Sequence, residues 1–463
     1  MTARLKRTII RSLTIVVLFA MVTLAGLYFL AKKLGPMVGK TPFRSISTHV
    51  AERKTDDAAA NVPFVAVEDW PAWRGPRGDG ISRETGIADS WPVRQAQGGL
   101  KERWSADVGL GYSSPIAAGG RVYLFSLDNG HDTLTCFSAA TGRIIWNDQS
   151  DAGYVGDFPG TRATPAIDGN SIYTLGGEGE LTRHDLATGK PVWRVNVLKL
   201  SGAAGTPGYG CGSSPLVAMG KVFVQGGKSA SGAPTAMAID QQTGAVAWLS
   251  EARDAAGYAH PILVDVPGPA GAGSPQLIIF GGTNLFGMDP ATGRTIWSQP
   301  WPTSYGVNSS TPVYSPADGR LFITSDYGMG CLMLQVSPDG ITKVWRSAKE
   351  VKSKFQQTIL DGGCLYANSE GRIRCLNWAD GTRKWEATAD DVQVGENGSI
   401  VRVGDKLLLM SDTGTLTLIR ATPEGFNVLG TSQVFDSKEI WATPLLYGGR
   451  VYIKGTKELV CLK

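Results

Sequence analysis

The stretch Ala238-Ile-Asp240-Gln-Gln-Thr243-Gly244-Ala-Val-Ala-Trp248 decides the fold, because variants of this phrase recur along most of the chain. An apolar strand leads to a turn with Thr-Gly at its tip, and the next strand ends in Trp. Gly accepts the positive-φ position of such a turn, and Asp and Thr oxygens can bond its backbone. Each copy therefore predicts a β-hairpin whose final ring packs against a neighbouring repeat.

Six further segments fit the phrase, some of them loosely, at residues 136–146, 183–193, 287–297, 335–345, 375–385 and 419–429. Counted from Trp104, their last positions lie 40 to 55 residues apart. This spacing suits four strands per repeat and is typical of a propeller or a solenoid. A second phrase, of the type Ser113-Ser114-Pro115, begins eight repeats and sets their number.

The two ends of the repeat region complement each other. The last repeat stops at Lys463, two residues after Cys461, and lacks the turn and the Trp of the phrase. The segment Lys101–Val108 offers a strand with Trp104 in the missing final place. We therefore predict an all-β fold, a closed propeller of eight four-stranded blades over residues 101–463, in which the N-terminal strand completes the last blade. Closure removes free sheet edges.

Three segments precede the propeller. Residues 13–31 carry no charge and as a helix would span about 28 Å, close to the thickness of a bilayer core. We expect residues 1–34 to be a single-helix membrane anchor, with a cleaved signal peptide as the alternative. The basic residues before the apolar run favour a cytoplasmic N-terminus and a propeller in the periplasm or another extracytoplasmic space.

Residues 35–68 are polar and Ala-rich, which is typical of a tether, and residues 69–100 are rich in Trp, Pro and Gly. We expect this second segment to strap onto the propeller. Trp70 and Trp73 are expected to dock the strap, and a binding role for either ring is the alternative.

Composition and motifs exclude several classes of function. The formal charge is only +4, and no basic patch interleaved with aromatic residues indicates nucleic-acid binding. Four His residues do not suggest a zinc site, and no hydrolase motif or P-loop occurs. The six Cys residues lack a CxxC spacing, so we expect free thiols, although an oxidising compartment would permit bridges. We assign no catalytic residue and no metal site.

The repeats resemble quinoprotein-type eight-bladed propellers, and more closely a bacterial group of exported PQQ-binding-like repeat proteins. The resemblance covers residues 69–463 and rests on the docking phrase and on Trp70-Pro-Ala-Trp73-Arg-Gly-Pro76, Arg162-Ala-Thr-Pro165, Asp326-Tyr-Gly-Met-Gly-Cys331 and Ala421-Thr-Pro-Glu-Gly-Phe426. It implies the propeller fold specifically. It does not settle function, because this architecture carries both dehydrogenases and non-catalytic scaffolds.

Resemblance to the catalytic members implies pyrroloquinoline quinone (PQQ) and a calcium ion held by Glu, Asn and Asp oxygens, commonly with an adjacent Cys-Cys disulfide. No Cys-Cys pair occurs here. Glu396 and Asn397 form the only adjacent acidic-amide pair before a blade, and their hard oxygen atoms suit calcium. They are the candidate cofactor-binding residues. The alternative is that Asn397 caps the start of a strand.

The loops that lead into the first strand of each blade, here called entrance loops, are expected to share one face with the loops between second and third strands. We expect a ligand-binding funnel there, formed by Arg162, Tyr209, Tyr258, His260, Tyr305, Asn308, Gln356, Gln357 and Trp441. The alternative is that these rings fill gaps between blades. His260 is expected to form hydrogen bonds in the channel rather than to act as a general base.

These observations favour a membrane-anchored, exported scaffold that binds a protein or a small molecule on the loop face. The alternative is an enzyme, a PQQ- and calcium-dependent dehydrogenase that oxidises an alcohol or a sugar.

Overall fold

The computed structural model describes residues 64–85, 100–228, 232–268 and 273–463. The apolar run of residues 13–31, the predicted anchor and most of the predicted tether lie outside these residues. Within the described ranges, no helix is long and apolar enough to span a bilayer.

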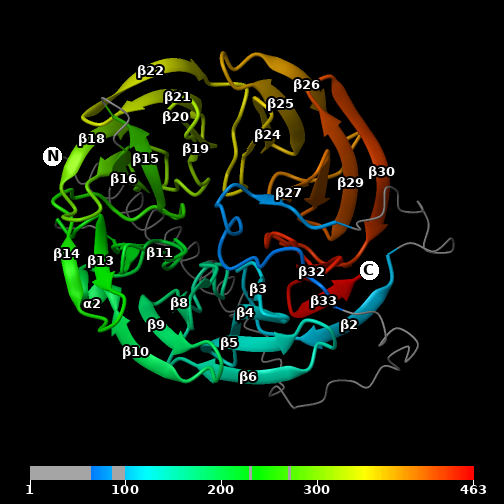
Figure 1. The fold of residues 1–463 in the computed structure, drawn as a ribbon, viewed down its shortest axis with the longest axis horizontal. Coiled ribbons are helices and arrows are strands. Elements are labelled where there is room, and N and C mark those ends of the chain that lie inside the picture. The colour runs from blue at the N-terminus through cyan, green and yellow to red at the C-terminus, as the bar shows by residue number, and fades with distance from the viewer. Residues whose placement is uncertain (1–63, 86–99, 229–231, 269–272) are drawn as a thin grey trace, which may run out of the picture. The chain divides into compact units, whose positions relative to one another are not determined.

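The described residues form eight sheets arranged in a ring (Figure 1), which confirms the predicted propeller. Blade 1 contains β3 (Ile116–Ala118), β4 (Arg121–Asp128), β5 (His131–Ser138) and β6 (Ile144–Gln149). Blade 2 contains β7 (Ala166–Asp168), β8 (Ser171–Leu175), β9 (Glu180–Asp185) and β10 (Pro191–Asn196), followed by the short helix α2 (Val197–Ser201). Blade 3 contains β11 (Leu216–Ala218), β12 (Lys221–Gln225), β13 (Ala236–Asp240) and β14 (Val246–Leu249). Blade 4 contains β15 (Ile262–Pro267), β16 (Gly273–Phe280), β17 (Asn284–Met288) and β18 (Thr295–Pro300).

The second half of the ring repeats this order. Blade 5 contains β19 (Val313–Ser315), β20 (Arg320–Ser325), β21 (Gly330–Ser337) and β22 (Gly340–Ser347). Blade 6 contains β23 (Ile359–Asp361), β24 (Cys364–Ser369), β25 (Arg372–Asn377) and β26 (Arg383–Ala387). Blade 7 contains β27 (Ser399–Val403), β28 (Lys406–Met410), β29 (Thr415–Thr422) and β30 (Gly425–Gln433), and β1 (Ile81–Ser82) adds a parallel edge to it.

The last blade is built from both ends of the repeat region, as predicted. Its inner strands are β31 (Leu445–Tyr447), β32 (Arg450–Lys454) and β33 (Glu458–Leu462), and β2 (Glu102–Asp107) is the outer strand. Strand β2 pairs antiparallel with β33, and Trp104 faces Cys461 in the register. The ring is therefore closed by strand pairing between residues more than 350 positions apart in the sequence.

The recurring Trp docks several blades onto the turn of the next blade. A Cβ atom added to Gly142, the turn glycine of blade 1, would lie 2.6 Å from the Trp104 ring, so only glycine leaves room for it. The indole Nε1 of Trp104 donates to the carbonyl of Ala139 at 3.1 Å. The Trp248 ring packs in the same way on Gly293, and its Nε1 donates to the carbonyl of Pro290 at 3.0 Å.

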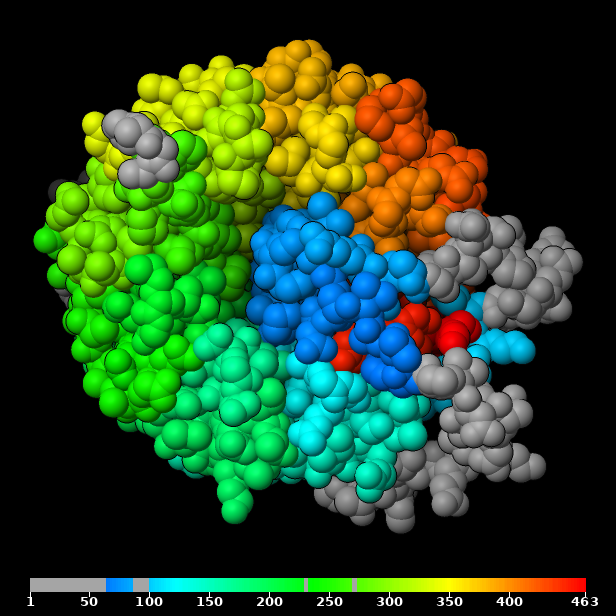
Figure 2. All heavy atoms as spheres, in the orientation of Figure 1, coloured from blue at the N-terminus to red at the C-terminus, as the bar shows by residue number. Residues whose placement is uncertain are grey.

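Residues 86–99 of the predicted strap lie outside the described residues. Residues 64–85, which contain the end of the predicted tether and the described start of the predicted strap and are called the strap from here on, cross the centre of one face of the ring (Figures 1 and 2). Trp70 is 5% exposed and exchanges two backbone hydrogen bonds with Ala117. The Arg74 side chain is buried, and its Nη2 donates to the carbonyl of Thr358 at 2.9 Å. These contacts show that Trp70 docks the strap, as expected from the sequence.

All six Cys residues are buried with free thiols. Cys364 pairs in register with Asn377, whereas Cys375 pairs with Tyr366, so the two Cys residues of this hairpin are not directly opposite each other.

Candidate functional site

The cavity considered as the candidate site has a volume of about 360 Å³. Eight of the residues that line it are aromatic, and most of them belong to entrance loops: Trp73, Tyr112, Phe158, Tyr209, Tyr258, Tyr327, Phe355 and Trp441. A volume of this size is in the range of small-ligand pockets. We call this cavity the funnel.

The strap forms the floor of the funnel. Asp69 accepts from the amide of Gly119, and Glu84 accepts from that of Gly449, so the strap is fixed to turns that follow first strands. Those turns lie at the opposite end of the strands from the entrance loops. Trp73 reaches from the strap into the cavity, where its Nε1 donates to Oγ1 of Thr311 at 2.9 Å. The funnel is therefore open toward the loop face and covered at its inner end.

Aromatic rings from different blades meet at Trp441, in the entrance loop of blade 8. Trp441 stacks on Tyr112 with ring centroids 4.4 Å apart and an interplanar angle of 23°. Its ring also contacts Phe355 at 5.0 Å and Phe158 at 5.3 Å. Such pairs stabilise their arrangement by about 0.5–1.5 kcal/mol beyond burial. Part of the expected rim therefore does pack between blades, and the same rings also line the cavity.

Arg162 holds one wall of the funnel. Its guanidinium donates to the carbonyls of Gly160 at 2.9 Å and Asp157 at 3.0 Å, and also to that of Phe158, whose φ is 54°. The same group lies 4.9 Å from the ring centroid of Tyr154. Burial lowers the pKa of Arg162. In the described part of the chain, no carboxylate forms an ion pair with it.

Tyr258 and His260 line the middle of the cavity. The hydroxyl of Tyr258 accepts from the amide of Tyr209 at 3.1 Å, and burial raises the pKa of Tyr258 to about 12. Nδ1 of His260 lies 3.0 Å from the carbonyl of Ser214, which requires the proton on that nitrogen. Burial lowers the pKa of His260 to about 4, so the imidazole is neutral at pH 7 and Nε2 is an acceptor.

The other expected funnel residues lie elsewhere. Tyr305 is 73% exposed and packs edge-on against Tyr327 at 5.6 Å, so it stands outside the lining. Asn308 is fully buried, and its Nδ2 donates to three carbonyls, including that of Gly281 at 2.9 Å. Gln356 and Gln357 are buried as well. Oε1 of Gln356 accepts from the amide of Lys354, and Nε2 of Gln357 donates to the carbonyl of Ile400. These three amides fix the loops.

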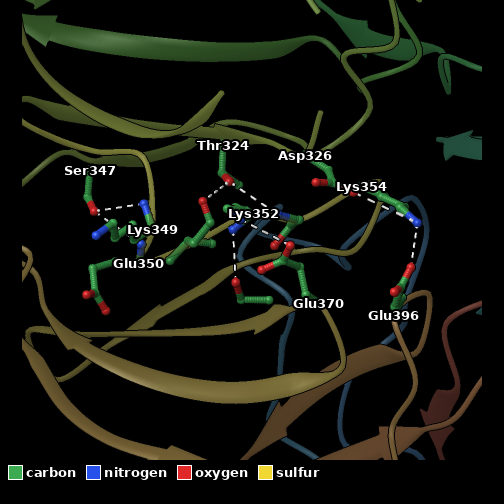
Figure 3. A network of polar contacts seen from close by, with 12 residues as sticks. Thr324, Asp326, Ser347, Lys349, Glu350, Lys352, Lys354, Glu370 and Glu396 are labelled. Carbon is green, nitrogen blue, oxygen red and sulfur yellow. Dashed lines mark hydrogen bonds and ion pairs between the residues drawn. The ribbon is translucent and has the colours of Figure 1, made fainter. Parts of the chain in front are cut away.

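The geometry around Glu396 and Asn397 does not fit a calcium site. Nζ of Lys354 lies 2.6 Å from Glu396 and 3.9 Å from Asp326 (Figure 3), so an ammonium group already occupies these carboxylates. The amide of Asn397 donates to Asp412 at 3.3 Å. Across the described ranges, no group of three or more His, Cys, Asp or Glu could hold a metal ion.

Sequence reasoning missed the lining residues Phe158 and Phe355, and it named Trp73 for a binding role only as the alternative to docking. A signal for Phe355 is present, because the position directly before the blade-starting phrase is aromatic in four repeats: Tyr112, Tyr258, Phe355 and Trp441. Phe158 has no comparable signal, since it lies five residues before the phrase at Ala163 in a longer loop.

Comparison with known proteins agrees with this architecture. A family model described as outer membrane protein assembly factor BamB matches residues 93–199 and 131–387. A curated protein of that name from Aliivibrio fischeri (strain ATCC 700601 / ES114) is 31% identical over 90 residues. The match covers 19% of this chain and 23% of that protein, so it spans about a quarter of the relative's length.

Solved structures share the fold. BamB from Moraxella catarrhalis aligns with a TM-score of 0.56 at 16% identity, over 79% of this chain and 97% of that one. A europium-containing methanol dehydrogenase aligns with a TM-score of 0.49 at 13% identity, over 86% and 90% of the two chains. At these identities the first likeness shows the propeller fold alone, and the second is too weak to bear on activity.

Proposed function

The chain belongs to the family of PQQ-like repeat propellers described as outer membrane protein assembly factor BamB, and from this premise we propose that it is an assembly scaffold outside the cytoplasm. In this proposal the funnel binds a protein partner. Residues 13–31 anchor the chain in the membrane, residues 35–68 provide reach, and the strap closes the propeller on the side away from the partner.

The observation that carries the proposal is the aromatic funnel on the loop face. Rings from six entrance loops converge there on a rigid ring of sheets. Tyr305, Phe158 and Val155, in the same set of loops, are at least 41% exposed. Large apolar side chains clustered on an exposed face are typical of protein-binding sites, and rigid loops lose little conformational entropy when they bind. An assembly role needs such a surface and no reacting group.

The experiment is capture of a partner by the full-length chain in the cells that make it, using mild crosslinking and mass spectrometry. The variant Tyr258→Ala with Trp441→Ala removes two funnel rings, and we expect it to lose a specific partner that the unaltered chain retains. Tyr314→Ala is the matched control, because this Tyr lies outside the funnel lining and its hydroxyl only donates to the carbonyl of Asp265. Equal capture by the double variant and the control would refute the assignment to the funnel.

A further inference from the structure

The shape of the funnel limits what can enter it. Its inner end is covered by the strap, with Trp73 as the floor, so a chain cannot thread through the ring from the loop face. A volume of about 360 Å³ admits side chains and a short length of backbone, and it excludes a folded element. The ligand must therefore insert from the loop side and leave by the same mouth.

The walls favour an aromatic group in the ligand. Trp441 and Tyr112 form a stacked pair, and Tyr209 lies with its ring centroid 6.0 Å from that of Tyr258. A further ring can pack against these faces and edges in the offset or tilted geometries that aromatic pairs prefer. Aliphatic groups would fill the same space without the electrostatic part of that interaction.

The charges favour an anionic ligand. The ionised side chains that line the funnel are Arg162 and Lys354, and no Asp or Glu is among the lining residues of the described chain. Lys354 already has Glu396 at 2.6 Å and Asp326 at 3.9 Å as partners. Arg162 donates to carbonyls and packs on ring faces, and its nearest electrostatic partner among the carboxylates, Asp132, forms no ion pair with it. A carboxylate brought to Arg162 would form a charge-assisted interaction in a partly dehydrated site, whereas an ammonium group would be repelled.

One lining atom requires a hydrogen-bond donor. Oδ1 of Asn397 is buried and has no hydrogen-bond partner in the structure, although Asn397 lines the funnel. Leaving such an acceptor unpaired is costly. A backbone amide pairs with this oxygen once the Asn397 side chain turns toward the cavity, whereas an ionised aromatic acid without an N–H group has no donor to offer. The funnel thus combines contacts for a ring, an anion and an amide donor, which together occur in a peptide.

We propose that the funnel binds an acidic peptide segment of the partner protein. In this segment one aromatic residue has acidic residues on both sides in sequence, and its ring inserts into the funnel. This inference rests on the proposed scaffold function and specifies the chemistry of the partner at the same site. Arg162 meets a carboxylate, the rings around Trp441 hold the inserted side chain, and Asn397 accepts from the peptide backbone.

The test uses the full-length chain in detergent and fluorescent five-residue peptides with both ends blocked. The sequence Gly-Asp-Phe-Asp-Gly should bind at least about tenfold more tightly than Gly-Asp-Ala-Asp-Gly and than Gly-Lys-Phe-Lys-Gly, which is the effect expected from one good ring contact or one charge contact. Affinity for the first peptide should fall with added salt, because part of it is electrostatic. Trp441→Leu should weaken it by a similar factor.

Arg162→Gln tests the charge, but it also removes the donors that hold residues 157–160, so Arg162→Lys is run beside it. We expect the Lys variant to retain most of the preference for Asp over Lys in the peptide, provided that thermal unfolding shows an intact propeller. Equal binding of the Asp and Lys peptides to the unaltered chain would overturn the proposal. Binding of 3-phenylpropionate as tight as that of the peptide would also overturn it, because the site would then be one for a small acid.

Absence of binding by all peptides would refute this inference while leaving partner capture through Tyr258 and Trp441 as a separate result. Failure of the unaltered chain to capture any specific partner would refute the scaffold proposal instead. The two failures are therefore distinguishable.

Discussion

Replacing Trp104 by Ala should destabilise the ring at its point of closure. Trp104 is 7% exposed, and its ring contacts Tyr452 at 5.7 Å and covers Gly142. Truncating a buried aromatic side chain to Ala costs about 3–5 kcal/mol. The lost hydrogen bond adds little, because the carbonyl of Ala139 still accepts from the hydroxyl of Tyr452 at 2.9 Å. We therefore expect the free energy of unfolding to fall by about 3–5 kcal/mol.

Urea denaturation measures this change, and Trp248→Ala is the matched control. Trp248 is 8% exposed and docks on Gly293 in the same geometry, but the hairpin that carries it is continuous in sequence. Both variants should lose similar stability. Only Trp104→Ala should also expose the amides of β33 to hydrogen exchange, because no hairpin turn joins β2 to that strand and the packing of Trp104 helps to hold it there. A loss below about 1 kcal/mol, or unchanged protection of β33, would refute the account of ring closure.

Three further predictions follow from single contacts. Burial raises the pKa of Asp132 to about 7 from 3.8, so the folded chain holds an extra proton between these values and its stability falls as pH rises through them. Asp132→Asn should melt at a higher temperature than the unaltered chain at pH 8 and approach it near pH 4, and a constant difference across this range would contradict the pKa assignment. Gly244→Ala should lower the melting temperature more than Gly220→Ala. Both glycines have positive φ, but only at position 244 would a Cβ lie 2.9 Å from the Trp193 ring. Equal shifts in melting temperature would show that the ring moves aside freely. Equilibrium dialysis with PQQ and calcium should show no stoichiometric uptake, because Lys354 already pairs with the carboxylate expected to hold calcium, and tight uptake with dye reduction would restore the dehydrogenase alternative.

The fold was predictable because the sequence pattern of each hairpin is local and recurs along the chain. Each Trp stands at a fixed distance past a turn glycine, so the hairpins, their spacing and the vacant place filled by Trp104 can be read directly from the sequence. Contacts that depend on tertiary placement were not predictable in this way. Arg74 meets the carbonyl of Thr358 across 284 positions, and no periodicity marks that pairing.

The candidate site was predictable only in part. Tyr258, His260 and Trp441 follow from the position of the entrance loops, and they line the funnel. Asn308 and Gln357 also lie on entrance loops, but their side-chain amides donate to carbonyls instead of lining the cavity. Burying an amide with such partners costs less free energy than leaving the carbonyls unpaired. Position on an entrance loop therefore indicates proximity to the axis and does not determine whether a side chain turns toward the cavity or into the loop.

The most direct measurement is photo-crosslinking from the two faces of the propeller, with benzoylphenylalanine placed at Tyr305 or at Thr188 of the full-length chain in the cells that make it. Tyr305 is 73% exposed beside the funnel, and Thr188 is exposed at a hairpin tip on the strap side. We predict a specific protein adduct from position 305 and none from position 188. An adduct from position 188 with none from position 305 would contradict the assignment of partner binding to the loop face.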